Sequence, residues 1–225
     1  MNVGSRGAVA GSSLLENVGG FFAIGFAFAT PFMSRRRRRW GATDDEVEGV
    51  HPGDELVPQA QWTATHAVSI AASPQEVWPW IAQVGQGRGG FYSYQRLENL
   101  AGCEIENTQR ILEEHQDVRV GDKIRLHVDI PPMTAAIVDK PTTLVVSGDP
   151  SADAGAVEIS SSWAFLLVEQ PDGTTRLLSR TRYHHGGGLR AKLMGGPYLV
   201  EPISFVMERK MLKVIKGLAE GRGTD

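Results

Sequence analysis

The stretch that decides the fold is Ser73-Pro74-Gln75-Glu76-Val77-Trp78-Pro79-Trp80, followed by the glycine-rich and aromatic segment 85–94, GQGRGGFYSY. Ser73 is suited to cap a helix, Pro74 to occupy its first turn, and Glu76 to complete a capping box. A helix is therefore predicted from Pro74 to about Val84, directly after a strand. The glycines and aromatic residues that follow are typical of a close-packed entrance to a ligand cavity and do not resemble a catalytic triad.

Alternating apolar and polar residues predict a strand before this helix and a run of hairpins after it. Residues 62–70 alternate with the period of a strand that has one buried face. A second short helix is expected over residues 94–101. Further strands are expected at 123–128, 134–139, 142–148, 157–169 and 174–184, and Pro171-Asp172-Gly173 is a hairpin turn signal.

The C-terminal part of the domain predicts one long amphipathic helix, because apolar residues between Leu199 and Leu218 recur at spacings of three and four. The order strand, helix, short helix, strands, long helix indicates an α+β fold with helices against one face of an antiparallel sheet. We expect a leader over residues 1–39, a surface connector over 40–61, the folded domain over 62–219 and a flexible tail over 220–225.

Charge and cysteine content exclude several classes of protein. The net charge is -3, but residues 1–40 hold six arginines and one glutamate, so they carry +5 and leave -8 for the remainder. An acidic body is a poor nucleic-acid binder, because phosphate binding needs a basic face. The single cysteine, Cys103, rules out an internal disulfide and fits a reduced cytoplasm.

The leader combines an apolar stretch with a basic run. Residues 18–33 are 16 uncharged residues, fewer than the roughly 20 needed to cross a bilayer, and Arg35 to Arg39 follow them. A secretory signal has the opposite order, so export is not expected and the body is placed in the cytoplasm. Two alternatives stay open for residues 14–39: attachment to the anionic inner face of the cell membrane, or a disordered, solvated segment.

Five short motifs carry a resemblance to a known family: Trp40-Gly41-Ala42-Thr43-Asp44, Pro52-Gly53-Asp54, Val77-Trp78-Pro79-Trp80, the Gly85–Tyr94 loop with Glu98-Asn99 after it, and Val206-Met207-Glu208-Arg209-Lys210-Met211. With the element order, residues 40–219 resemble the helix-grip fold of the START-like, or SRPBCC, superfamily, in a bacterial subgroup related to polyketide cyclase/dehydrase-like proteins. The resemblance implies a curved antiparallel sheet around the long C-terminal helix, with a hydrophobic cavity for a lipid-like or polyketide-like molecule. It does not imply one reaction.

The expected ligand contacts are aromatic and basic side chains of the first helix, the glycine-rich loop, two strands and the long helix: Trp80, Arg88, Phe91, Tyr92, Tyr94, Trp163, Phe165, Arg182, Tyr183 and Phe205. For the aromatic loop, plain packing is an equal alternative to pocket contact. Arg180 and Arg182 alternate with Ser179, Thr181 and Tyr183, so one set points inward and the other outward. Inward arginines would need a carboxylate or polar ligand, and solvent-facing arginines are favoured because buried arginine is uncommon.

Other candidate motifs do not support a catalytic or metal site. The G-x-G-x-x-G pattern at residues 85–90 follows a helix, whereas a dinucleotide site requires a preceding strand. His66 is expected to be a hydrogen-bonded core histidine. The adjacent pair His184-His185 cannot chelate one metal ion from a strand, and neither Cys103 nor Ser160–Ser162 has the sequence context of a nucleophile. No metal and no cofactor are predicted.

These observations favour binding or transport of a hydrophobic small molecule in an internal cavity. One alternative is a polyketide cyclase/dehydrase-like enzyme, in which confinement and proton transfer act on a reactive chain. A further alternative is an interaction module that its leader recruits to the membrane. Because no catalytic constellation is visible, the sequence favours binding over catalysis.

Overall fold

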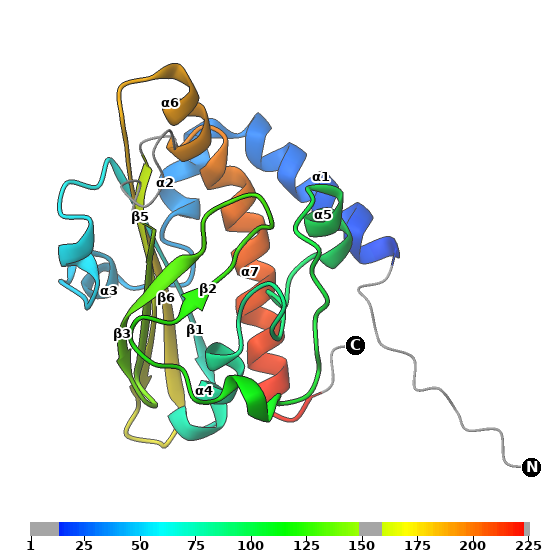
Figure 1. The fold of residues 1–225 in the computed structure, drawn as a ribbon, viewed down its shortest axis with the longest axis vertical. Coiled ribbons are helices and arrows are strands. Elements are labelled where there is room, and N and C mark those ends of the chain that lie inside the picture. Colours follow the sequence, from blue (N-terminus) through cyan, green and yellow to red (C-terminus); the bar gives the residue numbers. More distant parts are fainter. Residues whose placement is uncertain (1–13, 149–158, 223–225) are drawn as a thin grey trace, which may run out of the picture.

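A six-stranded antiparallel sheet and one long helix dominate the computed structural model, which describes residues 14–148 and 159–222. The strand order is β1-β6-β5-β4-β3-β2, and helix α7 (Val200–Ala219) runs across one face of the curved sheet (Figure 1). This α+β arrangement is that of the helix-grip fold. The predicted fold class is confirmed.

The strands follow the predicted order. They are β1 (Trp62–Ile70), β2 (Lys123–Ile124), β3 (Met133–Asp139), β4 (Thr143–Gly148), β5 (Ile159–Glu169) and β6 (Thr175–His185). Residues 157 and 158, the predicted start of the fifth strand, lie outside the described residues. Strand β2 is shorter than expected because the Arg125 carbonyl accepts a hydrogen bond from the Gln86 N–H (2.9 Å), so the chain there pairs with the glycine-rich loop and leaves the sheet.

The helices fill the remaining segments. Besides α7 they are α1 (Leu14–Ala29), η1 (Pro31–Met33), α2 (Ser34–Arg37), α3 (Asp44–Glu48), η2 (Asp54–Leu56), α4 (Pro74–Ala82), α5 (Gln95–Leu100), η3 (Glu113–His115) and α6 (Leu189–Gly195). The start of α4 is as predicted, since the Glu76 carboxylate accepts hydrogen bonds from the backbone N–H and the hydroxyl of Ser73, both at 2.8 Å.

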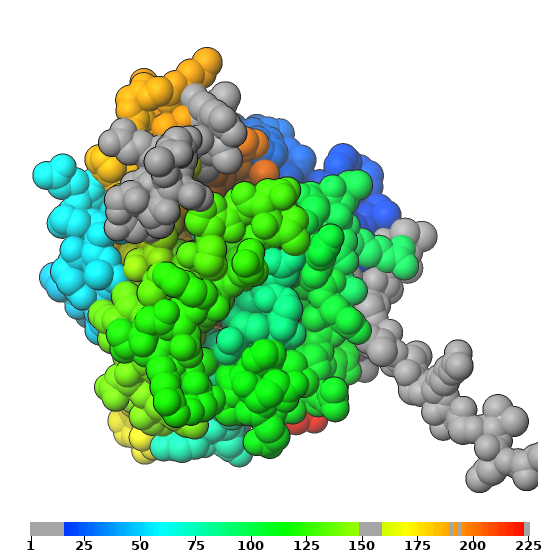
Figure 2. Space-filling view, in the orientation of Figure 1, coloured from blue at the N-terminus to red at the C-terminus, as the bar shows by residue number. Residues whose placement is uncertain are grey.

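The two faces of the sheet are covered by different parts of the chain. Helices α4 and α7 pack on the concave face, where the largest buried side chains include Trp78, Phe165, Leu177, Leu212 and Ile215. The opposite face carries a smaller cluster around Val145 and Leu166, under the segment that holds α3 and η2. Figure 2 shows the chain between α5 and β3, in green, forming much of the surface in front of α7.

The N-terminal helix α1 packs on α7 and α5 through small and polar residues. Gly20 lies so close to the Tyr94 ring that an added Cβ would come within 2.8 Å of it. After α1 the chain bends by 91° into the segment Pro31–Arg37. Among the described residues no single helix is long and apolar enough to cross a bilayer, and this bent pair meets that criterion only when its halves are combined.

The segment after α2 runs along the outer edge of β1. The Arg38 carbonyl accepts a hydrogen bond from the Thr65 N–H (2.7 Å), and the Trp40 carbonyl accepts one from the Ala67 N–H (3.1 Å). Because β1 is the first strand of the sheet, these N–H groups have no partner strand on that side. Residues 38–40 therefore satisfy donors that the sheet leaves open.

Candidate functional site

A pocket of about 470 Å³ opens between the concave face of the sheet and the helices α1, α5 and α7. Most of its lining is apolar, with side chains that include Phe21 and Ile24 of α1, Phe91 of the glycine-rich loop, Leu97 of α5, Trp163 of β5, Tyr183 of β6, and Met207 and Met211 of α7. The polar lining consists of Ser93, Glu98, Cys103, Thr181, Ser204 and Glu208. The pocket thus combines a mostly apolar lining with a few hydrogen-bonding groups, the usual composition of a small-molecule site.

Three of the residues expected to contact ligand line this pocket: Phe91, Trp163 and Tyr183. Trp163 is held in place because its indole N–H donates to the hydroxyl of Ser179 at 2.8 Å. The Tyr183 ring stacks on Trp62, with ring centroids 4.6 Å apart. The two aromatic side chains that the sheet places in the pocket are therefore fixed by contacts with neighbouring strands.

Three other expected aromatics, Trp80, Tyr92 and Phe165, lie in the hydrophobic core and outside the pocket lining. The Tyr92 hydroxyl accepts a hydrogen bond from the Gln83 side-chain amide at 2.7 Å, and its ring meets Trp80 edge-on. Burial raises the pKa of Tyr92 above its usual value. This part of the glycine-rich loop is fixed in the core.

Arg88, Tyr94 and Phe205 also lie outside the pocket lining. The Arg88 guanidinium donates to the backbone carbonyls of Ala82 (2.8 Å) and His115 (3.3 Å), so it closes the glycine-rich loop. The Tyr94 ring lies under the ammonium group of Lys210, 6.0 Å from its centroid. Phe205 packs edge-on against His66.

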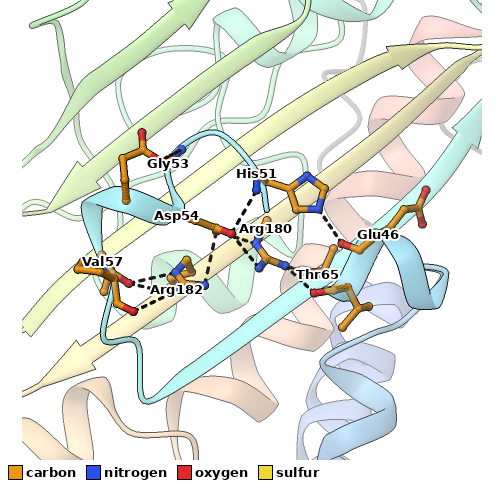
Figure 3. Close-up of polar contacts among 11 residues, drawn as sticks. Glu46, His51, Gly53, Asp54, Val57, Thr65, Arg180 and Arg182 are labelled. Atoms are coloured by element: carbon orange, nitrogen blue, oxygen red, sulfur yellow. Dashed lines mark hydrogen bonds and ion pairs between the residues drawn. The ribbon is translucent and has the colours of Figure 1, made fainter. Parts of the chain in front are cut away.

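Arg180 of β6 is buried and Arg182 is half-buried, both on the outer face of the sheet, against the segment that carries η2 (Figure 3). Arg180 donates to both carboxylate oxygens of Asp54, at 2.8 and 3.1 Å, and Arg182 donates to the Val57 carbonyl at 3.1 Å. Burial alone would raise the pKa of Asp54, but the hydrogen bond and the charge of Arg180 hold it below its usual value.

Our expectation that these arginines face solvent is therefore wrong, and they do not reach the pocket either. The alternation of β6 sends Tyr183 to the concave face and Arg182 to the other. There the segment carrying η2 covers the arginines and supplies the carboxylate that a buried guanidinium needs.

Sequence reasoning missed the two carboxyl groups of the pocket, Glu98 and Glu208. Glu98 is only 6% exposed, and its Oε2 has no hydrogen-bond partner among the described residues. Burial raises the pKa of Glu98 to about 7. The sequence did indicate that Glu208 is buried. This acidic residue lies on the apolar stripe of α7, seven residues after Glu201 and four before Leu212.

Glu208, unlike Glu98, is fully paired. Its Oε2 lies 2.8 Å from Nδ1 of His66, and its Oε1 accepts a hydrogen bond from the Ser179 hydroxyl. The other ring nitrogen of His66 lies 2.9 Å from the carbonyl oxygen of Arg37. Burial alone lowers the pKa of His66, but the charge and hydrogen bond of Glu208, with the Arg37 carbonyl, raise it overall. His66 is therefore a hydrogen-bonded core histidine, as expected, and its two acceptors favour the charged form.

Two further titratable groups of the pocket, Tyr183 and Cys103, stay protonated at neutral pH. Burial, with a smaller effect from Glu208, raises the pKa of Tyr183 to about 12. Burial and the nearby Glu98 raise the pKa of the Cys103 thiol. Within residues 14–148 and 159–222, no group of three or more His, Cys, Asp or Glu side chains is placed to hold a metal ion. Glu98 is thus the pocket group whose shifted pKa lies close to neutral pH.

Comparisons with known proteins give structural neighbours only, since no protein-family model and no curated protein matches the chain. The chain is similar to the Zhui aromatase/cyclase from a Streptomyces species, at 19% identity and a TM-score of 0.40, over 71% of this chain and 93% of that one. It is similar to norcoclaurine synthase from Thalictrum flavum, at 16% identity and a TM-score of 0.39, over 70% and 93%. It is also similar to CalU16 from Micromonospora echinospora, at 14% identity and a TM-score of 0.33, over 71% and 84%. The expected resemblance to polyketide cyclase-like proteins is thus found again among solved structures, and it concerns the fold alone.

Proposed function

We propose that this protein binds a hydrophobic small molecule, lipid-like or polyketide-like, in the pocket between the sheet and α7. The observation that carries the proposal is a mostly apolar pocket of about 470 Å³ with a buried carboxyl oxygen, on Glu98, that has no hydrogen-bond partner within residues 14–148 and 159–222. Buried polar groups are nearly always hydrogen-bonded, so an orphan oxygen at a pocket wall marks the position for a donor on a ligand.

The apolar lining would supply most of the affinity. Each square ångström of apolar surface removed from water contributes roughly 25 cal/mol, so rings or chains packed between Phe91, Trp163 and Met207 gain by burial alone. Polar contacts would then orient the molecule. A hydroxyl or amine of the ligand opposite Glu98 satisfies the carboxyl group, which a purely hydrocarbon ligand leaves unpaired.

Filling the pocket should abolish ligand binding without unfolding the protein. Ser204 lies on α7, half-buried at the pocket wall, so in Ser204→Trp the indole occupies the ligand volume. We expect at least tenfold weaker binding of a fluorescent fatty-acid probe, measured by titration, and loss of any co-purified molecule in native mass spectra. Lys213→Trp, at an exposed site on the same helix, is the matched control and should bind normally. Unchanged probe affinity in Ser204→Trp would count against the pocket as the binding site.

A second candidate function is catalysis of a cyclisation or dehydration, and the acidity of Glu98 favours it. A general acid or base works best with a pKa near the working pH, and the pKa of Glu98 is about 7. The phenol of Tyr183 lines the same pocket and stays protonated, so it can donate a hydrogen bond to a developing enolate. Confinement of a reactive chain in the pocket would supply the rest of the rate enhancement.

Glu98→Gln tests the protonation of Glu98 directly. Because the pKa rises from 4.5 to about 7 on folding, the neutral carboxyl group stabilises the native state below pH 4.5, and this stability is lost as the pH rises through 7. Glutamine imitates the neutral acid, so the variant should be more stable than the native protein at pH 8 by on the order of 3 kcal/mol and equal to it near pH 4.

The measurement is urea unfolding at both pH values, with Glu106→Gln at an exposed site as the control. If Glu98 is also catalytic, its glutamine variant should keep probe binding and lose turnover of a polyketide substrate. A product profile that stays the same in Glu98→Gln would argue for binding without catalysis.

A further inference from the structure

The amphipathic pattern of α1 is reversed relative to an ordinary surface helix. Its buried positions are small or polar: Asn17, Gly20 and Ala27, and Thr30 directly after the helix is buried as well. Its exposed positions, together with η1, present Phe21, Phe22, Phe26, Phe28 and Phe32, which are 41–82% exposed and are five of the eight phenylalanines in the chain. Large apolar side chains on one exposed face indicate a surface that is covered by another apolar phase.

The surface formed by these five phenylalanines of α1 and η1, the phenylalanine face, continues onto neighbouring elements. Tyr198, 84% exposed, shares a small hollow with Phe28 and Pro31 at the end of α1. At the other side, Phe21 of α1 and Ile203 of α7 are both partly exposed and both line the ligand pocket. Figure 1 shows α1 on the outside of α7, away from the sheet.

The charged residues beside the phenylalanine face indicate which kind of partner it binds. Arg35 and Arg36 directly follow η1 and are exposed. The next arginine, Arg37, points inward to Glu201, and Arg39 pairs with Asp44. On α1 itself the one acidic residue, Glu16, is paired with Lys210 at 2.7 Å. An apolar face bordered by exposed arginines is complementary to a lipid surface with negative headgroups.

We propose that the phenylalanine face of α1 and η1, with Tyr198, Arg35 and Arg36, docks on an anionic lipid surface. The helix lies in the plane of the interface, with its phenylalanines among the acyl chains and the arginines at the headgroups. Insofar as the pocket binds a lipid-soluble ligand, as proposed above, the shared residues Phe21 and Ile203 place its opening at the docked surface. The ligand can then pass from the lipid into the pocket without crossing water.

The test is co-sedimentation of the full chain with phosphatidylcholine vesicles, with and without about one third phosphatidylserine, near 0.1 M salt. The native protein should bind the anionic vesicles at least tenfold more tightly than the neutral ones. Phe22→Ser with Phe26→Ser should weaken binding to anionic vesicles at least tenfold, and Arg35→Glu with Arg36→Glu should remove the preference for them. Val50→Ser with Val120→Ser, at loop sites that are 91% and 64% exposed, is the control and should bind normally.

Equal vesicle binding by the native protein and the phenylalanine variant would overturn the proposal. So would a native dimer in solution that the same variant dissociates without any vesicle binding, since the face would then cover a second copy. Phe22 and Phe26 do not line the pocket, so the variant should keep the affinity for the fatty-acid probe. Ser204→Trp, conversely, should keep vesicle binding, which separates failure of the docking surface from failure of the pocket.

Discussion

Replacing Glu208 by alanine is expected to lower the free energy of unfolding by about 3–5 kcal/mol near pH 6. The substitution takes away the carboxylate that lies 2.8 Å from Nδ1 of His66, so a proton held on this buried ring loses its counter-charge, and it removes the acceptor of the Ser179 hydroxyl as well. An isolated charge in a low-dielectric interior is far less stable than a paired one. The measurement is urea unfolding of the native protein and the variant.

The same pair sets a direction for the pH dependence of stability. Because the pKa of His66 is raised on folding, its ion pair contributes fully below the unfolded value of 6.5 and is lost as the pH rises through the folded pKa. The stability difference between native protein and Glu208→Ala should therefore shrink above pH 6.5. Lys213→Ala, at an exposed site on the same helix, should show neither effect.

A double replacement distinguishes the cost of removing the whole His66–Glu208 pair from the cost of leaving one partner unpaired. His66→Phe combined with Glu208→Met removes both charges together, so it should be less destabilising than Glu208→Ala alone. A loss under about 1 kcal/mol in Glu208→Ala would contradict the charged pair and indicate that His66 is neutral in the native state.

Replacing Glu201 by glutamine should have a comparable effect, about 3–5 kcal/mol, by breaking the buried pair that joins the N-terminal segment to α7. The Arg37 Nε and Nη2 donate to the two oxygens of Glu201 at 2.9 and 2.8 Å, and the side chains are only 7% and 2% exposed. Glutamine keeps one acceptor and leaves the guanidinium charge uncompensated. Hydrogen exchange over residues 14–37 should accelerate with the loss of global stability.

The second ion pair of this segment provides the control. Lys210 and Glu16 also join α7 to α1, but both side chains are partly exposed, so Lys210→Met should cost at most about 1 kcal/mol. Replacing Arg37 and Glu201 together by methionine should restore most of the stability lost in Glu201→Gln. If Glu201→Gln were as mild as Lys210→Met, the buried pair would not be what holds the segment in place.

The fold could be predicted because local patterns determine it. The capping residues Ser73 and Glu76 start α4 where expected, and alternation over residues 62–70 matches β1 from end to end. Strand β2 could not be bounded, because the chain from Arg125 onward keeps the alternating pattern but bonds to the glycine-rich loop. The end of β2 depends on the hydrogen bond between Gln86 and Arg125, which lie 39 positions apart. The local periodicity of the sequence contains no information about such a contact.

The site was harder to predict because an apolar side chain has the same signature in a core and in a pocket wall. Trp80 and Phe165 fill the core, whereas Trp163, two residues before Phe165 on the same face of β5, lines the pocket. The partner of Arg180 comes from a connector more than a hundred residues earlier, so no local pattern places that arginine. The packing of α1 likewise depends on a pair, Arg37 and Glu201, that lies 164 residues apart.

The backbone contact of residues 38–40 with β1 has a consequence for how the protein should be handled. An open strand edge is a template on which another chain can add. Without the carbonyls of Arg38 and Trp40, the backbone N–H groups of Thr65 and Ala67 would lack acceptors. The β1 strands of two molecules could then pair with each other. We therefore expect a shortened chain beginning at residue 41 to aggregate, because residues 38–40 no longer cover the edge of β1.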